Sequence, residues 1–183
     1  MDARDTLIAE LRAHALVLGE VVLSSGAVAQ YYVDAKRATL LPTGFKAMGE
    51  LVAGYAREWD ATAVGGLTMG ADPVACSALA AGADVKVFLI RKETKAHGLQ
   101  RRVEGPFLDD ADRCLVVEDV VTSGGSTLQA IDALRADGRT IVGVVSVLDR
   151  LAGGADAIRA AIGDAPYVAL ATIDDVHPDR DRG

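Results

Sequence analysis

The sequence predicts an α/β fold in which a mostly parallel central sheet is flanked by helices, with a small N-terminal hood formed within residues 1–40. Three observations lead to this prediction. Short apolar segments alternate with helical patterns after residue 62, as in parallel sheets that are covered on both faces. Half of the residues are hydrophobic, which is enough for a sizeable core. The first 40 residues do not follow the alternation. We therefore expect one domain over residues 1–183, to which residues 1–40 add a helix and the hood.

The N-terminal region is expected to hold a helix and a hairpin. Apolar residues at helical spacing predict a helix over Thr6–Leu18, which Gly19 would end. Two short strands, Glu20–Leu23 and Tyr31–Ala35, would be joined by small turn residues. A second helix is predicted over Pro42–Trp59, because proline is favourable in the first turn of a helix.

Strands and helices alternate along the rest of the chain. The expected strands are Ala63–Gly66, Val85–Ile90, Leu115–Val117, Thr140–Leu148 and Tyr167–Ala171, and the expected helices are Ala71–Ala81, Thr127–Ala136 and Gly154–Ile162. The charged tail, His177–Gly183, is expected to be loose. In an open parallel sheet, ligands bind at the carboxyl ends of the strands. The loops that leave those ends would meet at one cleft, namely Gly66–Gly70, Arg91–Gly105, Glu118–Ser126 and Asp149–Arg150.

Composition narrows the class of partner. The net charge of −7 argues against nucleic acid or an anionic membrane as the main partner. The wholly apolar stretches are shorter than ten residues, too short to span a bilayer, and the acidic start Met1–Asp5 is not expected to be a signal peptide. Cys76 and Cys114 lack the CxxC spacing of metal sites, which favours two buried or free thiols in a reducing cytoplasm.

The most informative segment follows the strand Leu115–Val117. Two carboxylates, Glu118 and Asp119, stand at its end, and the loop Thr122–Ser126 then leads into a helix. An acidic pair alone is often only a turn or a helix cap. Here, small residues at a helix start would let backbone N–H groups bind a phosphate, and paired carboxylates suit the vicinal hydroxyls of a ribose. The segment therefore indicates a ribose 5-phosphate ligand; no Walker A pattern is present.

A second segment, Arg91–Arg102, carries five basic side chains and one acidic one in an acidic protein. A basic run is most often a solvated surface. This one follows an apolar strand and belongs to a stretch of fifteen residues, and such long loops often serve as active-site lids. Lys95 and His97 could neutralise charge that develops on a leaving group such as pyrophosphate.

The segment Cys114–Ser126 resembles the phosphoribosyl-pyrophosphate signature of phosphoribosyltransferases. Together with Arg-Lys-x-x-Lys-x-His-Gly at 91–98, it resembles the orotate phosphoribosyltransferases specifically. Leu23–Gly26 with Tyr31–Asp34 looks like the hood of that family, and Asp149-Arg150 looks like its pyrimidine-contacting arginine. The resemblance extends over nearly the whole chain. It implies the type I phosphoribosyltransferase fold and transfer of ribose 5-phosphate from phosphoribosyl pyrophosphate to orotate, giving orotidine 5′-phosphate and pyrophosphate in pyrimidine biosynthesis.

The resemblance also implies roles for matching residues. Lys95, His97 and Asp119 would be catalytic. Phosphoribosyl pyrophosphate would be bound by Arg91, Lys92, Lys95, His97, Glu118, Asp119, Val120, Val121, Thr122, Ser123, Gly124, Gly125 and Ser126. Orotate would be bound by Thr122, Arg150 and backbone groups of Tyr31 and Tyr32. Mg²⁺ would be held mainly by the substrate, and the protein would be a cytoplasmic homodimer in which each active site receives the lid of the other chain.

Three positions depart from the pattern of many relatives. Ser24 and Met69 stand where many members carry lysine, and Glu118 stands where some carry aspartate. We expect Lys36 or Arg37 to supply the missing charge. Two alternatives stay open: a phosphoribosyltransferase for another base, or a non-catalytic sensor of phosphoribosyl pyrophosphate. The basic lid favours turnover, and the N-terminal region lacks a helix-turn-helix. The isolated histidines, His14 and His177, are expected at the surface or in packing roles.

Overall fold

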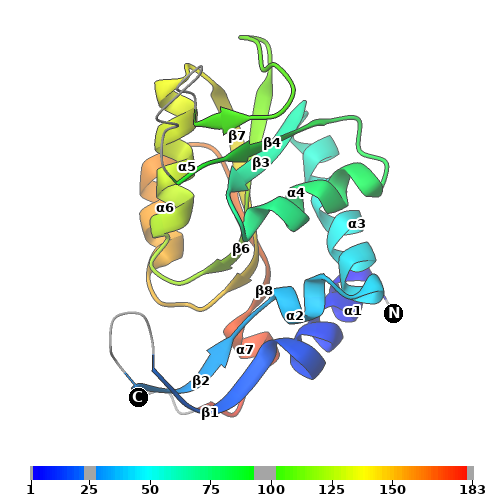
Figure 1. The fold of residues 1–183 in the computed structure, drawn as a ribbon, viewed down its shortest axis with the longest axis vertical. Helices are drawn as coiled ribbons and strands as arrows, with labels where there is room; N and C mark the ends of the chain where they lie inside the picture. Colours follow the sequence, from blue (N-terminus) through cyan, green and yellow to red (C-terminus); the bar gives the residue numbers. More distant parts are fainter. Residues whose placement is uncertain (1, 23–27, 93–101, 181–183) are drawn as a thin grey trace.

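The computed structural model describes residues 2–22, 28–92 and 102–180 (Figure 1). Its centre is a six-stranded sheet in the order β5-β4-β3-β6-β7-β8. These strands are β3 (Ala63–Leu67), β4 (Lys86–Ile90), β5 (Val103–Glu104), β6 (Arg113–Val121), β7 (Thr140–Asp149) and β8 (Tyr167–Thr172). Every pairing is parallel except that of β5 with β4. The predicted fold class, a mostly parallel sheet flanked by helices, is confirmed.

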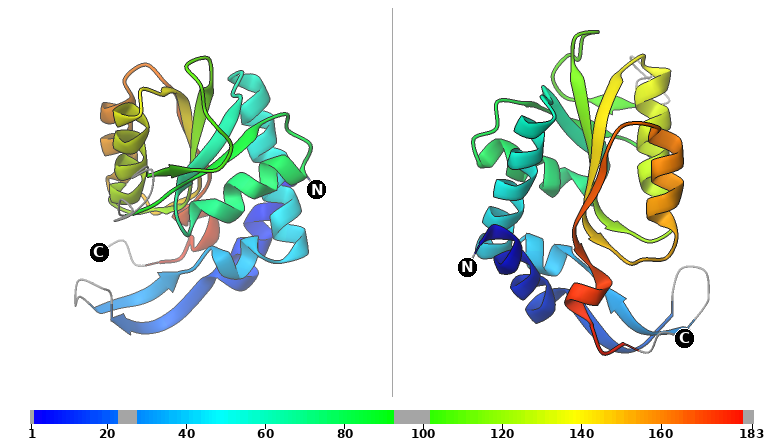
Figure 2. Two further views of the ribbon diagram at one scale, coloured as in Figure 1. Left: turned by 45° about the horizontal axis from the view of Figure 1, so that its top comes forward. Right: turned by 180° about the vertical axis from the view of Figure 1, so that it is seen from behind.

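Helices cover both faces of this sheet. The α-helices of the described residues are α1 (Ala3–Glu10), α2 (Lys36–Thr39), α3 (Pro42–Glu58), α4 (Ala71–Ala80), α5 (Gly125–Ala136), α6 (Gly154–Ile162) and α7 (Ile173–Val176). Figures 1 and 2 show α3 and α4 on one face and α5 and α6 on the other. Among the described residues, no helix is long and apolar enough to cross a membrane.

The apolar run of β6 shows why its strand was recognisable. Leu115 and Val117 belong to the core cluster on the α3–α4 side, while Cys114 and Val116 belong to the cluster on the α5–α6 side. Because successive side chains of a strand point to opposite faces, a strand that is covered twice must be apolar at every position.

The hood is a two-stranded antiparallel hairpin of β1 (Leu16–Val22) and β2 (Val28–Val33). The predicted helix over Thr6–Leu18 is wrong at its end: α1 continues only as a π-helical turn, η1 (Leu11–Ala15), and Leu16 already pairs with Val33. Gly19 does not end a helix. It lies at an irregularity of the hairpin register with φ of 117°, a conformation that glycine adopts readily. The end of the first helix was therefore decided by cross-strand pairing, which cannot be predicted from helical periodicity.

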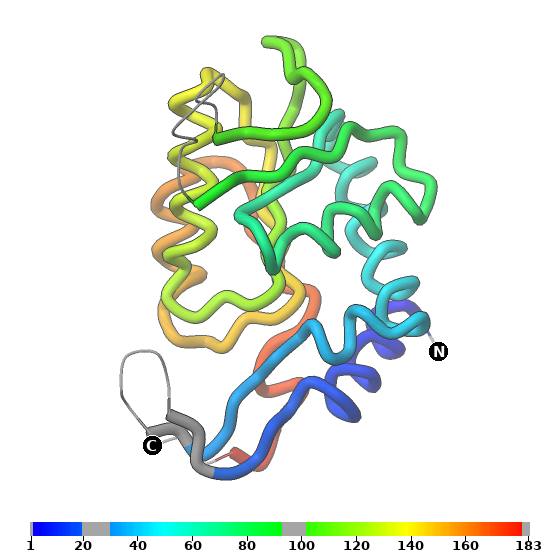
Figure 3. The backbone as a smooth tube through the Cα atoms, in the orientation of Figure 1, coloured from blue at the N-terminus to red at the C-terminus, as the bar shows by residue number. Residues whose placement is uncertain are grey.

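The end of the described chain is docked rather than loose. Arg4 of α1 donates to the backbone oxygen of Leu170 (3.0 Å) and pairs with Asp175 (3.1 Å). Arg12 donates to the Asp175 backbone oxygen. Figure 3 shows the first and last segments side by side next to the hood. His177 packs against the Tyr31 ring, at 5.3 Å between centroids, and Arg180 pairs with Asp174. The predicted loose tail is therefore wrong for residues 177–180; residues 181–183 lie outside the described part.

Candidate active site

The two adjacent carboxylates lie at the end of β6 and have unlike surroundings. Glu118 is buried, only 4% exposed, and accepts hydrogen bonds from the Asp119 amide (3.2 Å) and the Thr127 hydroxyl (3.3 Å). Burial, reinforced by the neighbouring charge of Asp119, raises the pKa of Glu118 to about 8. Burial therefore favours the protonated form of Glu118.

Asp119 is fixed in direction by its neighbours. Its Oδ1 accepts a hydrogen bond from the Val120 amide at 2.8 Å. On the other side, a Cβ added at Gly70 would lie 2.4 Å from that same oxygen, so the absence of a side chain at position 70 lets the backbone approach the carboxylate. The other oxygen, Oδ2, receives the Lys36 ammonium at 3.3 Å.

The loop after β6 forms a hollow of about 330 Å³ at the start of α5. It is lined by Glu118, Val120, Thr122, Ser123, Gly124, Gly125, Ser126, Thr127 and Gln129. Gly124 has φ of 80° and packs against α6, where an added Cβ would lie 3.0 Å from the Gly154 backbone oxygen. The first N–H groups of a helix have no partners within the helix and carry the positive end of its dipole. This hollow can therefore hold a phosphate.

A larger cleft of about 600 Å³ adjoins this hollow. Its lining combines the hood, the β3–α4 loop, the end of β4, the β6 carboxylates and the end of β7: Tyr32, Val33, Lys36, Leu67, Thr68, Met69, Gly70, Lys92, Glu118, Asp119, Val120, Thr122, Ser126 and Arg150. The Arg150 guanidinium lies over the Tyr31 ring, 5.3 Å from its centroid. The predicted meeting of the four strand-end loops is confirmed for their described residues. Three cations line this cleft and would face a ligand: Lys36, Lys92 and Arg150.

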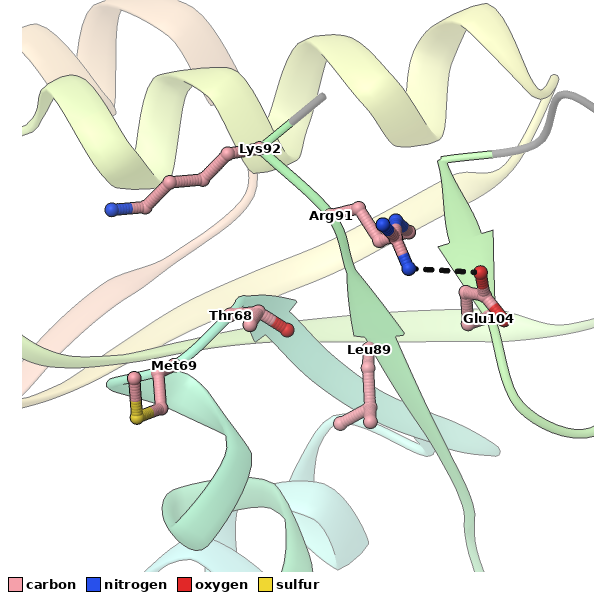
Figure 4. A pocket seen from close by; sticks show the side chains of 6 residues that line it. All are labelled: Thr68, Met69, Leu89, Arg91, Lys92 and Glu104. Carbon is pink, nitrogen blue, oxygen red and sulfur yellow. Dashed lines mark ion pairs between the residues drawn. The ribbon is translucent and has the colours of Figure 1, made fainter. Parts of the chain in front are cut away.

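The base of the basic segment lines a neighbouring hollow, shown in Figure 4. Arg91 turns toward Glu104, with 3.8 Å between Nη1 and Oε1, and Lys92 extends the opposite way above Met69 (Figure 4). The predicted fifteen-residue stretch without structure is corrected here, because β5 pairs with the end of β4. Lys95 and His97 lie outside the described residues.

Not every predicted residue faces the cleft. Val121 is 1% exposed and packs in the core on the α5–α6 side. Tyr31 lies beneath Arg150 with its ring edge on His177, at 5.3 Å between centroids, so Tyr32 alone of the two lines the cleft. Thr68 and Gly70 were not singled out from the sequence. Their only signal was their place in a loop after a strand.

The comparisons with known proteins agree with this geometry. The phosphoribosyl transferase domain family matches residues 40–161. An orotate phosphoribosyltransferase of Corynebacterium glutamicum is 48% identical over 177 residues, covering 96% of this chain and 95% of its own.

Solved structures give the same result. The crystal structure of Mycobacterium tuberculosis orotate phosphoribosyltransferase with Fe(III) dicitrate is 41% identical, with a TM-score of 0.85 over 96% of this chain and 99% of that one. Its complex with 5-phospho-α-D-ribosyl 1-diphosphate has a TM-score of 0.80 at 36% identity, over 95% and 98% of the two chains. The chain belongs to the phosphoribosyltransferase family and, within it, to the orotate phosphoribosyltransferases.

Proposed function

We infer that the cleft transfers ribose 5-phosphate from phosphoribosyl pyrophosphate to orotate, releasing pyrophosphate and forming orotidine 5′-phosphate. One observation carries this assignment: the paired carboxylates of β6 share a cleft with the α5 phosphate hollow, Lys92 and Arg150. The family membership of the chain supports the same reaction.

We assign the sugar phosphate to the end of β6. Asp119 would accept hydrogen bonds from the ribose hydroxyls. With Glu118 protonated, the pair of carboxyl groups would carry a single negative charge next to these hydroxyls. Residues 122–126 would bind the 5-phosphate through backbone N–H groups and hydroxyls. In this position the anomeric carbon of the ribose would face the larger cleft.

The base and the leaving group would occupy the larger cleft. Arg150 would bind the pyrimidine edge or its carboxylate through the planar fork of its guanidinium, close to Tyr32 and backbone groups of the hood. Lys92, with Arg91 and the lid residues Lys95 and His97, would stabilise negative charge on departing pyrophosphate. The family resemblance implies an oxocarbenium-like transition state, for which electrostatic stabilisation would supply most of the rate enhancement.

We assign Mg²⁺ to the substrate rather than to a set of protein ligands. In the stretches 2–22, 28–92 and 102–180, no group of three or more His, Cys, Asp or Glu side chains is arranged to hold a metal ion. Glu118 accepts two hydrogen bonds, and Asp119 pairs with Lys36. These residues fit an ion held mainly by pyrophosphate and ribose oxygens, where it would neutralise phosphate charge.

A homodimer that exchanges lids completes the proposal, since the lid is long and basic.

The direct test is loss of orotate absorbance when protein, orotate, Mg²⁺ and phosphoribosyl pyrophosphate are mixed. Uracil, which lacks the carboxylate of orotate, serves as the competing base. We expect orotate to be consumed and uracil to be a poor substrate. Equal use of both bases would show that orotate is wrongly assigned as the substrate. Binding of phosphoribosyl pyrophosphate without turnover of either base would favour a sensor.

A further inference from the structure

Lys36 links the hood to the catalytic strand. It begins the short helix α2, directly after the hood strand β2, and its ammonium lies 3.0 Å from Asp34 Oδ1 and 3.3 Å from Asp119 Oδ2. Its side chain is 38% exposed and lines the larger cleft. Partial burial opposes its charge, yet hydrogen bonding to Asp34 and the charge of Asp119 hold the pKa of Lys36 above its ordinary value.

The partner of Lys36 is the oxygen that the ribose needs. Asp119 Oδ1 is engaged by the Val120 amide and lies against Gly70, whereas Oδ2 carries the ion pair with Lys36. A ribose hydroxyl that donates to Asp119 must therefore share or replace the Lys36 contact. Asp34 remains as a second anchor, so Lys36 can leave Asp119 without losing every charged partner.

The other cations of the cleft and of the neighbouring hollow are differently engaged. Arg150 lies over the Tyr31 ring, and Arg91 turns toward Glu104. Lys92 is exposed, and its side chain extends above Met69 (Figure 4). Lys36 is thus the described cation whose ammonium is already at the ribose site. In the substrate, pyrophosphate is attached to the ribose carbon next to one of the hydroxyl-bearing carbons.

We propose that Lys36 is a binding residue for the pyrophosphate group, held on Asp119 in the free protein and released toward that group when the ribose hydroxyls bind Asp119. The proposal rests on the proposed function, because it uses the same ribose position. Lys36, at the start of α2, would supply positive charge that many relatives carry on lysines at the positions of Ser24 and Met69.

The test compares two ligands that differ by the pyrophosphate alone. Calorimetry in the presence of Mg²⁺ measures the Kd of phosphoribosyl pyrophosphate and of ribose 5-phosphate for the wild type, Lys36→Met and Lys36→Arg. Lys36→Met should weaken phosphoribosyl pyrophosphate binding by about tenfold or more, as expected for a charged hydrogen bond. Ribose 5-phosphate should bind as before or more tightly, because its hydroxyls no longer compete with the ammonium. Lys36→Arg should restore most of the loss.

Arg37→Met is the matched control: it is the next residue of the same helix, but its side chain is exposed and does not line the cleft. It should leave both affinities unchanged. Equal weakening of both ligands by Lys36→Met would show that Lys36 only supports Asp119 or the hood, and unchanged affinities would remove any role; either result overturns the proposal. A wild type that binds no phosphoribosyl pyrophosphate would instead overturn the proposed function, and thermal melting separates loss of binding from loss of folding.

Discussion

At the residue scale, two adjacent carboxylates of one strand have different chemistry because their side chains point to opposite sides of the sheet. Glu118 points inward and is protected from water by Thr127 and the core. Asp119 points to the cleft and pairs with Lys36. One segment of chain therefore supplies a largely neutral hydrogen-bonding group and an anion side by side, both of which a ribose can use.

Glu118 should make stability fall as pH rises. Its pKa is about 8 in the folded protein against an ordinary value of 4.5, so between these values unfolding releases a proton and is favoured by higher pH. Below about pH 4.5 the carboxyl is protonated in both states and makes no difference. Glu118→Gln should gain stability relative to the wild type progressively from about pH 4.5 to 8, as measured by urea unfolding.

The control for this prediction is Asp84→Asn, at an exposed carboxylate between α4 and β4. It should not alter the pH dependence. A constant difference between Glu118→Gln and the wild type across this range would mean that Glu118 is ionised in the folded protein.

Arg150 should govern affinity for the base. Arg150→Ala removes a guanidinium that lines the cleft and should raise the KM for orotate by about tenfold or more, the range for charged hydrogen bonds. Binding of ribose 5-phosphate should stay close to that of the wild type, because Arg150 does not line the phosphate hollow at the start of α5. Arg57→Ala, at an exposed arginine of α3, is the control for steady-state kinetics. Unchanged KM for orotate would remove Arg150 from the base site.

At the element scale, the site depends on how closely neighbouring loops approach. The β3–α4 loop passes against Asp119, and the loop after β6 passes against the start of α6, in both cases at glycines. Glycine permits these contacts because it has no Cβ. The carboxylate and the phosphate hollow are thus positioned by backbone atoms of the adjacent elements as well as by their own strand.

Two glycine substitutions separate this positioning from stability. In Gly70→Ala the new Cβ would meet the Asp119 carboxylate, at 2.4 Å in the present geometry, so the carboxylate must move and affinity for ribose 5-phosphate should fall. Gly54→Ala lies within α3 with nothing within 4 Å of the new Cβ. It should stabilise the protein by about 0.5–1 kcal/mol, because alanine is the better helix former.

Calorimetry and urea unfolding on both variants check the pair. Wild-type affinity in Gly70→Ala would show that the β3–α4 loop does not position Asp119. Weakened affinity in Gly54→Ala would show that ligand binding responds to a change outside the lining of the cleft.

At the scale of the whole molecule, the larger cleft lies between the hood and the carboxyl edge of the sheet. The basic segment leaves that edge from the paired ends of β4 and β5, where Arg91 donates its amide to the Arg102 backbone oxygen at 2.9 Å. The exchange of lids in a symmetric dimer stays a proposal about residues 93–101, which lie outside the described part of the chain.

Mixing two poorly active variants tests the exchange. Arg150→Ala impairs the base site of its own chain, and Lys95→Ala impairs the lid that it donates. In a hybrid dimer one site would carry both defects and the other none, so equal mixing should return activity to roughly a quarter of the wild type. Native mass spectrometry verifies that hybrids form. Hybrids without activity would mean that each chain uses its own lid.

The sequence by itself determined the fold class and much of the site. Strands that are buried on both faces must be apolar throughout, and helices must carry apolar residues at their own spacing, so the parallel sheet could be predicted from local pattern. The signature Glu118–Ser126 could be predicted for the same reason: a phosphate hollow at a helix start requires a short local run of small residues. Each of these features is encoded by neighbours in the chain.

Tertiary structure alone decided what depends on distant partners. The end of the first helix was set by pairing of Leu16 with Val33, and the end of the described chain was docked by Arg4, which reaches Leu170 and Asp175. Between Lys36 and Arg37, adjacent and equally charged, only the fold distinguishes the one that reaches Asp119, 83 residues away. The raised pKa of Glu118 likewise follows from burial, which no local pattern reports. Contacts across long sequence separations depend on how elements pack together, and packing is a property of the folded chain as a whole.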